Sequence, residues 1–560
     1  MNLYTALDAF RNWDGFRLEP AKVTGSSNIF GIGEFISTLA LLVIVVTVSD
    51  FRYRYRFAVR RLNVRTLGIG VATIIGLFLI VTEVWFQNSL PIFRFINNYS
   101  NLKIVLAAAF IVLVLYVVAT CFMRPQKFQR SNAKQFFEAT AHLIHQGNAD
   151  RLQVVAEELS FSIARIFERA AKIPNGDGAV QRMLPPEQGY ARSLLLLIAD
   201  RRFCHLIVDR VPGFAIQCFE LAAKYPNIPF AQFSRNVGEE FITNETSAFY
   251  QEDSGFQSGF FGYLKPITTT VFGSYKLVER CASKNACPLD ISYKWLDTFD
   301  EKQMEGFSRA ALAFFDSYLQ EDKGQTHSFA FARLINSFKN SLRGTYKLKG
   351  ASGDYWKTPE YHHLAITAEF VHDAINSLDK HAIRPNGLRR KKVGRHYDTF
   401  DSFADLIFEM ILATSHVSEP DWTCWHIQHN TVWSSLFTSS RSNASSIILF
   451  KLRRLIYDEI KKMDKFVNFK GAGFLGYCLN VLGLTLVDRH KGFGREHYPL
   501  HAVVLSWTKR NYRRLVTDHP KVAERCLQGS VAYDRENHRL FKSFANDTRK
   551  EPGVELFNLD

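Results

Sequence analysis

One short segment combines thiol and imidazole side chains, which are the donor groups that zinc prefers in proteins. Cys424, His426 and His429 lie within six residues of one another, and His416 lies a few residues before them. A common zinc pattern pairs two cysteines with two histidines, but no second cysteine lies near this segment. On a helix, His426 and His429 would share a face and Cys424 would lie off it. Two interpretations stay open: a zinc site, or buried, hydrogen-bonded histidines in a tryptophan-rich segment.

A second set of titratable residues lies on a predicted helix. Thr358 followed by Pro359 is typical of a helix start, and apolar residues recur at helical spacing from Leu364 to Leu378. Three titratable residues lie on the opposite face: His362, Glu369 and Asp373. Such residues can hold a metal or exchange protons. Because the apolar stripe lies opposite, we expect this face to be exposed to solvent.

The pattern G-x-G-x-x-G, which occurs in dinucleotide sites, runs from Gly471 to Gly476. A dinucleotide site needs these glycines in a turn between a strand and a helix. The preceding residues here continue a helical pattern, and no further strand–helix units follow. We therefore expect the glycines to permit close packing between helices.

Three long apolar runs precede all of these residues. They span 29–48, 67–86 and 104–123, and the only charges inside them are Glu34 and Glu83. About 20 apolar residues are enough for a helix to cross a bilayer. The sequence therefore predicts three transmembrane helices within 29–123, and the alternative is a set of buried core helices.

The charges between the runs predict an orientation. The connection between the first two runs carries six arginines: Arg52, Arg54, Arg56, Arg60, Arg61 and Arg65. Basic residues mark the cytoplasmic side of a membrane and commonly lie at its interface. We expect a multi-pass protein of the bacterial inner (plasma) membrane, with the tail 1–28 outside and everything after residue 123 in the cytosol.

Small and acidic residues within the apolar runs allow two interpretations each. Gly68, Ala72 and Gly76 recur every four residues, which lets another helix approach closely, either within the three-helix unit or between copies in a homo-oligomer. Glu34 and Glu83 occur at similar depths near the outer ends of their runs. They either attract cations or extend toward the lipid headgroups.

The chain after residue 123 reads as a large helical domain. The whole protein has a net charge of +15 over 560 residues. The cysteines of this domain are scattered along the sequence, as expected in a reducing cytosol. Amphipathic helices are predicted near 151–170, 358–378, 442–463 and 499–518, whereas alternating strand patterns are scarce. We therefore predict an all-α fold, with possible subdomains at 124–265 and 266–560.

A basic loop in this domain offers an anion-binding site. Its residues are Arg389, Arg390, Lys391, Lys392 and Arg395. Such a cluster binds anionic lipid, nucleotide or nucleic acid, or is simply solvated. In a membrane-anchored protein, contact with the inner leaflet needs the fewest assumptions.

For each group of titratable residues above, a structural interpretation is at least as well supported as a catalytic one. The sequence therefore favours a sensor, scaffold or effector over an enzyme. In this hypothesis, binding of a cytosolic ligand or of a still unidentified protein partner is transmitted to an oligomeric membrane bundle, which permeabilises the membrane or acts as a channel. No cofactor is expected. The alternative is a membrane-tethered, metal-dependent hydrolase that uses zinc at 416–429 or the helix 362–373.

Overall fold

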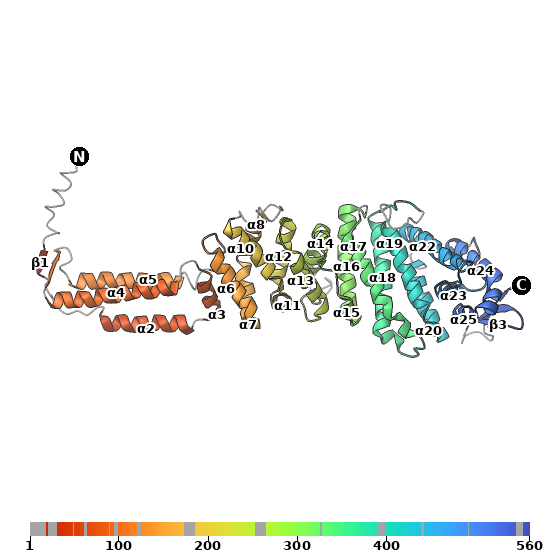
Figure 1. The fold of residues 1–560 in the computed structure, drawn as a ribbon, viewed down its shortest axis with the longest axis horizontal. Helices are drawn as coiled ribbons and strands as arrows, with labels where there is room; N and C mark the ends of the chain where they lie inside the picture. The colour runs from red at the N-terminus through yellow and green to blue at the C-terminus, as the bar shows by residue number, and fades with distance from the viewer. Residues whose placement is uncertain are drawn as a thin grey trace, which may run out of the picture. The chain divides into compact units, whose positions relative to one another are not determined.

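A computed structural model describes most of the chain, which is mostly helical (Figure 1). It describes residues 18–20, 31–48, 50–60, 64–88, 90–93, 99–119, 125–172, 185–252, 265–324, 327–388, 398–437, 442–490, 492–544 and 553–560. The chain forms two compact units. The first comprises 1–214 with 227–229, and the second comprises 215–226 with 230–560.

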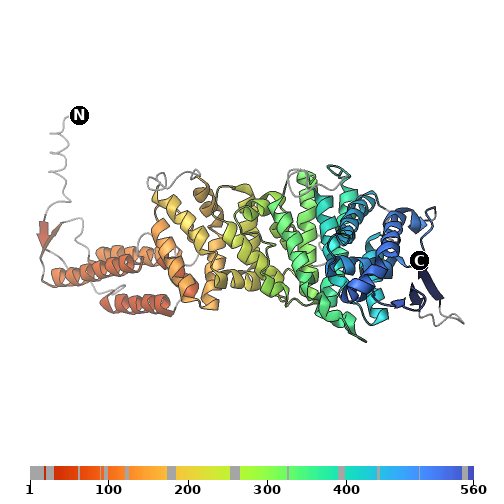
Figure 2. The same ribbon diagram turned by 45° about the vertical axis from the view of Figure 1, so that its right-hand side comes forward.

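The first unit begins with a bundle of apolar helices. These are α2 (Ile32–Val48), α4 (Val64–Gln87) and α5 (Tyr99–Val118), and a short antiparallel pair, β1 (Leu18–Pro20) with β2 (Pro91–Phe93), lies beside them. Figures 1 and 2 show α4 and α5 side by side. The bundle core contains Phe35, Ala72, Ile75, Leu79, Phe110 and Leu113. Each of the three predicted apolar runs therefore contains a helix that packs against the others.

One of these helices is long and apolar enough to cross a membrane. Within the described residues, Ile69–Gln87 has a mean hydropathy of 2.2, whereas the apolar helix Leu102–Tyr116 is shorter. The prediction of helices at these places is confirmed. Their number as membrane spans stays a prediction.

The rest of the first unit is a helical body. Its helices are α3 (Phe51–Ala58), α6 (Ala133–Gln146), α7 (Ala149–Ser160), α8 (Ile163–Ala171), α10 (Pro186–Leu197) and α11 (Arg201–Arg210). The helix α12 (Pro212–Lys224) contains the point at which the first unit gives way to the second.

The second unit is a larger helical body. Its earlier helices are α13 (Ala231–Thr243), the π-helix η5 (Thr268–Phe272), α14 (Tyr275–Ala282), α15 (Tyr293–Leu296), α16 (Glu301–Asp322), α17 (Phe329–Ser341) and the 3₁₀ helices η6 (Leu342–Leu348) and η7 (Tyr355–Lys357). The later ones are α18 (Pro359–Lys380), α19 (Thr399–Thr414), α20 (Asp421–Trp425), the π-helix η8 (His426–Ser434), α21 (Ser435–Phe437), α22 (Asn443–Lys462), α23 (Phe469–Leu482), α24 (Gly492–Asp518) and α25 (Pro520–Arg525). Helices α16, α18 and α22 pack in sequence, and α19 lies against α22 (Figures 1 and 2).

The second unit also contains a small sheet that the all-α prediction missed. Strands β3 (Val531–Asp534), β4 (Arg539–Phe544) and β5 (Gly553–Asn558) form an antiparallel sheet with β4 in the middle. In β5, Val554 and Leu556 are exposed, while Glu555 accepts a hydrogen bond from the backbone N–H of Leu484 at 2.6 Å. Because an acid points inward and apolar residues point outward, the strand lacks the hydropathy pattern from which it would be predicted.

The last predicted helix begins earlier than expected. Helix α24 starts at Gly492 and contains Pro499 in its interior, whereas the sequence predicted a start at Pro499. Proline cannot donate the hydrogen bond that an interior helical residue normally makes. The side chain of Arg453 donates to the carbonyl of Glu496, one of the carbonyls in the turn before the proline.

Candidate functional site

The candidate site lies where α16 and α18 pack against each other. Each helix starts at a side-chain cap: Asp300 accepts from the backbone N–H of Gln303 at 2.8 Å, and Thr358 accepts from that of Tyr361 at 3.4 Å. The predicted helix start at Thr358 and Pro359 is therefore confirmed. The two caps fix the first turns of both helices at one end of the packed pair.

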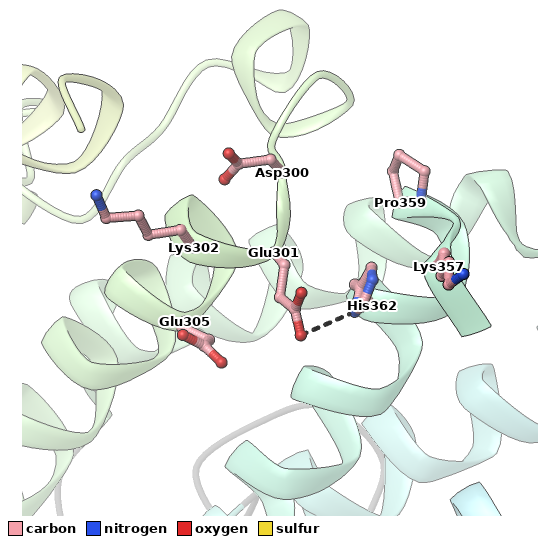
Figure 3. Close-up of a pocket in the computed structure, with 7 residues that line it drawn as sticks. All are labelled: Asp300, Glu301, Lys302, Glu305, Lys357, Pro359 and His362. Carbon is pink, nitrogen blue, oxygen red and sulfur yellow. Dashed lines mark ion pairs between the residues drawn. The ribbon is translucent and has the colours of Figure 1, made fainter.

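A cavity of about 420 Å³ opens between these first turns (Figure 3). It is lined by Asp300, Glu301, Lys302, Glu305, Lys357, Pro359 and His362. The ring of His362 points toward Glu301, with Nδ1 3.2 Å from Oε1 (Figure 3). The two lysines interact with other groups, since Lys357 donates to Asp354 and Lys302 donates to the carbonyl of Glu245. With three carboxyl groups against two lysines, the cavity wall is slightly acidic.

Glu305 shows the effect of this acidic wall. Partial burial is the largest cause that raises the pKa of Glu305 above its ordinary value, and the nearby charges of Glu301 and Glu369 raise it further. Glu305 and Glu369 have no ion pair within the described ranges. A cation or a proton is therefore favoured at this face. The predicted solvent-facing stripe agrees with the exposure of Glu369 and the partial exposure of His362 and Asp373.

A second cavity, of about 410 Å³, lies between α18 and the π-helix η8. It is lined by Tyr361, Ala365, Ala368, Glu369, His372, His426, Asn430, Thr431 and Ser435. The rings of Tyr361 and His426 stack with centroids 6.3 Å apart, and Tyr355 hydrogen-bonds to Nδ1 of His426 at 2.8 Å. His372 hydrogen-bonds through Nδ1 to the carbonyl of Ser435 at 3.1 Å. Aromatic and polar groups thus meet in one small hollow.

The three predicted zinc ligands have different partners. Cys424 is buried and accepts a hydrogen bond from Asn480 at 3.4 Å, and burial raises its pKa to about 12. His426 faces the second cavity, while His429 stacks on Trp425 with ring centroids 4.7 Å apart. Burial lowers the pKa of both histidines. In the part of the chain that the structure describes, no group of three or more His, Cys, Asp or Glu side chains is suited to hold a metal ion.

Cys424 belongs instead to a buried polar network centred on Gln428. The Gln428 amide donates to Gln528 at 2.8 Å and to the carbonyl of Thr414 at 3.1 Å, and it accepts from Asn480 at 3.0 Å. Tyr477 donates to the Gln428 carbonyl at 2.8 Å. The network connects η8 with α19, α23 and the segment after α25. Sequence reasoning missed it, because single glutamines and asparagines give no periodic signal.

The glycines of the G-x-G-x-x-G pattern all lie within α23, so they do not form a dinucleotide-binding turn. A Cβ atom on Gly476 would lie 2.8 Å from the carbonyl oxygen of Cys526, and one on Gly471 would lie 2.6 Å from Cγ of Met463. The expectation that these glycines permit close packing is confirmed. They let α23 approach both the end of α22 and the segment after α25.

Helix α3 connects the apolar bundle to the body of the first unit. Arg56 is buried and donates two hydrogen bonds to Glu158 of α7, at 2.9 and 2.7 Å. Tyr55 is also buried, and its hydroxyl lies 2.9 Å from that of Thr140 in α6. Arg52 forms a further ion pair with Glu157. Two of the six arginines predicted to lie at the membrane interface therefore bind carboxylates of the body.

The small-residue face of α4 packs within the bundle. Ala72 is buried, and a Cβ atom on Gly76 would lie 2.9 Å from the ring of Phe35 in α2. Gly68 lies in the first turns of α4, where side-chain surroundings are not described. Of the two predicted uses of this face, packing inside the three-helix unit is the one observed at Ala72 and Gly76.

The two acids of the apolar runs have different surroundings. Glu34 is exposed and accepts a hydrogen bond from the backbone N–H of Gly31 at 2.8 Å. Glu83 is half-buried in α4. Attraction of cations and extension toward headgroups both stay predictions for these two acids.

Several predicted basic residues lie outside the described part of the chain. These are Arg61 and the anion-binding candidates Arg389, Arg390, Lys391, Lys392 and Arg395. Of the other interface arginines, Arg54 is exposed, Arg60 is half-buried, and Arg65 lies in α4 without a described side chain. Contact of these residues with lipid headgroups or other anions stays a prediction.

Comparison with known proteins assigns no family to this chain. No protein-family description matches the sequence, and a search of curated proteins finds no match. Among solved structures, a crystal structure of an engineered protein aligns over 70% of this chain and 95% of its own, with 12% identity and a TM-score of 0.18. A likeness of this size carries no argument about fold or function.

Proposed function

We propose that this chain is a multi-pass protein of the bacterial plasma membrane, in which a cytosolic helical body controls an oligomeric bundle of transmembrane helices. The N-terminal tail lies outside, and the body lies in the cytosol. A ligand or protein partner that binds the body changes the bundle, and the change opens a path through the membrane. The attachment of α3 to the body is the observation that carries this proposal.

The surface of the bundle supports its placement in lipid. Only 28% of the Ile69–Gln87 segment is buried, which is unlike a core helix of a soluble protein. Its exposed side chains include Ile69, Ile74, Leu77, Phe78, Ile80, Val81 and Val84, and those of α5 include Ile104, Val105, Ile111, Val112 and Leu115. An apolar surface of this extent requires a partner, and hydrocarbon suits it.

The position of α3 in the chain suits it to transmit movement. It is separated from α2 only by residues 49–50 and from α4 only by residues 59–63. Its buried Arg56 side chain binds Glu158 through two hydrogen bonds, a geometry that fixes both distance and orientation. Since an unpaired buried charge is costly, α3 is expected to follow α7 when α7 moves.

A charge-exchange experiment tests this coupling. Full-length protein is reconstituted into liposomes, and release of an entrapped dye is measured for the wild type, Arg56→Glu, Glu158→Arg and the double variant. We expect each single change to alter release at equal protein incorporation, because it places two like charges together. The double change should restore release toward the wild-type level, because it recreates an ion pair.

Arg54→Glu is the matched control, because Arg54 lies on the same helix with an exposed side chain. Liposomes that release no more dye than empty ones, for the wild type and for all the variants, would contradict the permeation part of the proposal. Single variants that behave like Arg54→Glu would contradict the coupling part. The alternative, a metal-dependent hydrolase, has no comparable observation in its favour among the described residues.

A further inference from the structure

The turn between α22 and α23 presents two phenylalanines to solvent. Phe466 is 74% exposed, more than any other large apolar side chain in the described ranges, and Phe469 is 57% exposed. Exposed aromatic side chains are costly in water, and a group of them often marks a contact surface.

Lysines flank these two phenylalanines in the sequence. The ammonium groups of Lys461 and Lys470 lie over the rings of Tyr457 and Phe408. Residues 461–470 contain Lys461, Lys462, Lys465 and Lys470, all exposed, and a single acid, Asp464. The carboxylate of Asp464 accepts a hydrogen bond from the indole N–H of Trp507 at 2.7 Å, and Lys462 pairs with Glu459 at 2.7 Å. We call residues 461–470 the basic aromatic turn. Its charge is positive overall.

The turn is held firmly, so the exposure of its rings is not the result of a loose loop. Met463 is fully buried, and a Cβ atom on Gly471 would lie 2.6 Å from Cγ of Met463. The side chain of Asn468 accepts from the backbone N–H of Gly471 at 2.8 Å and thereby starts α23. These contacts direct Met463 inward and leave Phe466 and Phe469 at the apex of the chain reversal.

We propose that the basic aromatic turn binds the surface of an anionic lipid bilayer. Lysines attract acidic headgroups, and aromatic rings enter the boundary between headgroups and acyl chains. Single-stranded nucleic acid also binds lysine and aromatic residues, but it is usually held along a groove, with successive bases on successive rings. Two rings at the apex of a tight turn suit a broad surface better. This site is distinct from the basic loop at 389–395.

Vesicle flotation tests the proposal. Full-length protein is held in nanodiscs of phosphatidylcholine and mixed with vesicles that contain phosphatidylglycerol or only phosphatidylcholine. We expect the protein to float with the anionic vesicles, and empty nanodiscs to remain behind. Binding should weaken with added salt and become about fivefold weaker in Lys465→Gln, as expected for one basic residue near a charged surface.

The double variant Phe466→Ser/Phe469→Ser should reduce binding by roughly tenfold or more, because two apolar rings no longer enter the lipid. Phe161→Ser is the matched control, since Phe161 is 51% exposed in the first unit, and it should bind as the wild type does. The proposal is overturned if the protein does not float with anionic vesicles, or if the variants of the turn bind them normally. It is equally overturned if these variants lose binding only to a labelled oligothymidylate, which would assign nucleic acid instead.

Discussion

One buried lysine of the second unit, Lys451 in α22, is shared between two aspartates. Lys451 is 1% exposed, and its Nζ lies 3.2 Å from Asp398 and 2.9 Å from Asp401. Burial raises the pKa of Asp401 to about 6 from its ordinary value of 3.8, and the charge of Asp398 also raises it, although Lys451 opposes the shift. The folded protein therefore binds this proton more tightly than the unfolded chain does.

The sign of this shift predicts how stability depends on pH. Because the folded-state pKa of Asp401 is raised, its contribution to the free energy of unfolding is fully present below about pH 4 and is lost as the pH rises through about 6. In the Asp401→Asn variant, we expect the free energy of unfolding to lack the decrease that Asp401 causes as the pH rises. Urea unfolding of the purified protein between pH 4 and pH 7, followed by circular dichroism, measures it.

Asp458→Asn provides the control, because Asp458 is exposed on α22 and pairs with Arg454 at the surface. This variant should keep the wild-type dependence on pH. If Asp401→Asn and the wild type lose stability equally between pH 4 and pH 7, the carboxyl group of Asp401 is not the source of the pH dependence.

At the scale of the helix, Gly476 shows how packing can outweigh helix propensity. A Cβ atom there would lie 2.6 Å from the Gln528 amide nitrogen and 2.8 Å from the Cys526 carbonyl oxygen. We expect Gly476→Ala to lower the free energy of unfolding by about 1–3 kcal/mol, the usual cost of overpacking. Alanine is otherwise the better helix former, so a gain in stability would show that α23 can move away from its neighbours.

Gly189 in α10 is the matched helical glycine without close neighbours. No atom lies within 4 Å of a Cβ atom built on it. Gly189→Ala should therefore raise the free energy of unfolding, by about 0.5–1 kcal/mol. Urea midpoints of both variants, compared with the wild type, distinguish the effect of packing from that of propensity.

Helices were predictable from the sequence where local signals determine them. Thr358 and Ser442 cap the helices that their sequences predict, because a capping side chain acts within three residues. Helix α3 was not predicted. Its arginines resemble a membrane-side loop, and their carboxylate partners, Glu157 and Glu158, lie about a hundred residues away. Such long-range pairs leave no pattern in either segment.

The candidate site was predictable only in part, for the same reason. The stripe of His362, Glu369 and Asp373 follows from helical spacing, but its partner residues Glu301 and Glu305 come from another helix. The proximity of Cys424, His426 and His429 in sequence suggested a shared ligand. In the structure, the three side chains contact different groups: Cys424 contacts Asn480, His426 contacts Tyr355, and His429 stacks on Trp425. They therefore do not form one ligand set.

At the scale of the whole molecule, the proposed orientation predicts which residues can be labelled from outside the cell. Seven cysteines are buried in the described ranges, so single new cysteines can be introduced into a Cys121→Ser background. Asn88 follows α4 on the side predicted to be external, and Asp458 lies on the body predicted to be cytosolic. An impermeant maleimide should label Asn88→Cys on intact cells and Asp458→Cys only after permeabilisation.

The orientation follows from the arginines between the first two apolar helices, which are expected to stay on the cytosolic side. Helix α4 lies between these arginines and Asn88, and α5 lies between Asn88 and Asp458. Asn88 and Asp458 should therefore be labelled differently if α5 crosses the bilayer, and Asn88 should be external if α4 crosses it as well. Equal labelling of both cysteines on intact cells would remove the transmembrane assignment of α5. Labelling of Asp458→Cys alone would reverse the orientation, and the arginines of α3 would then face the exterior.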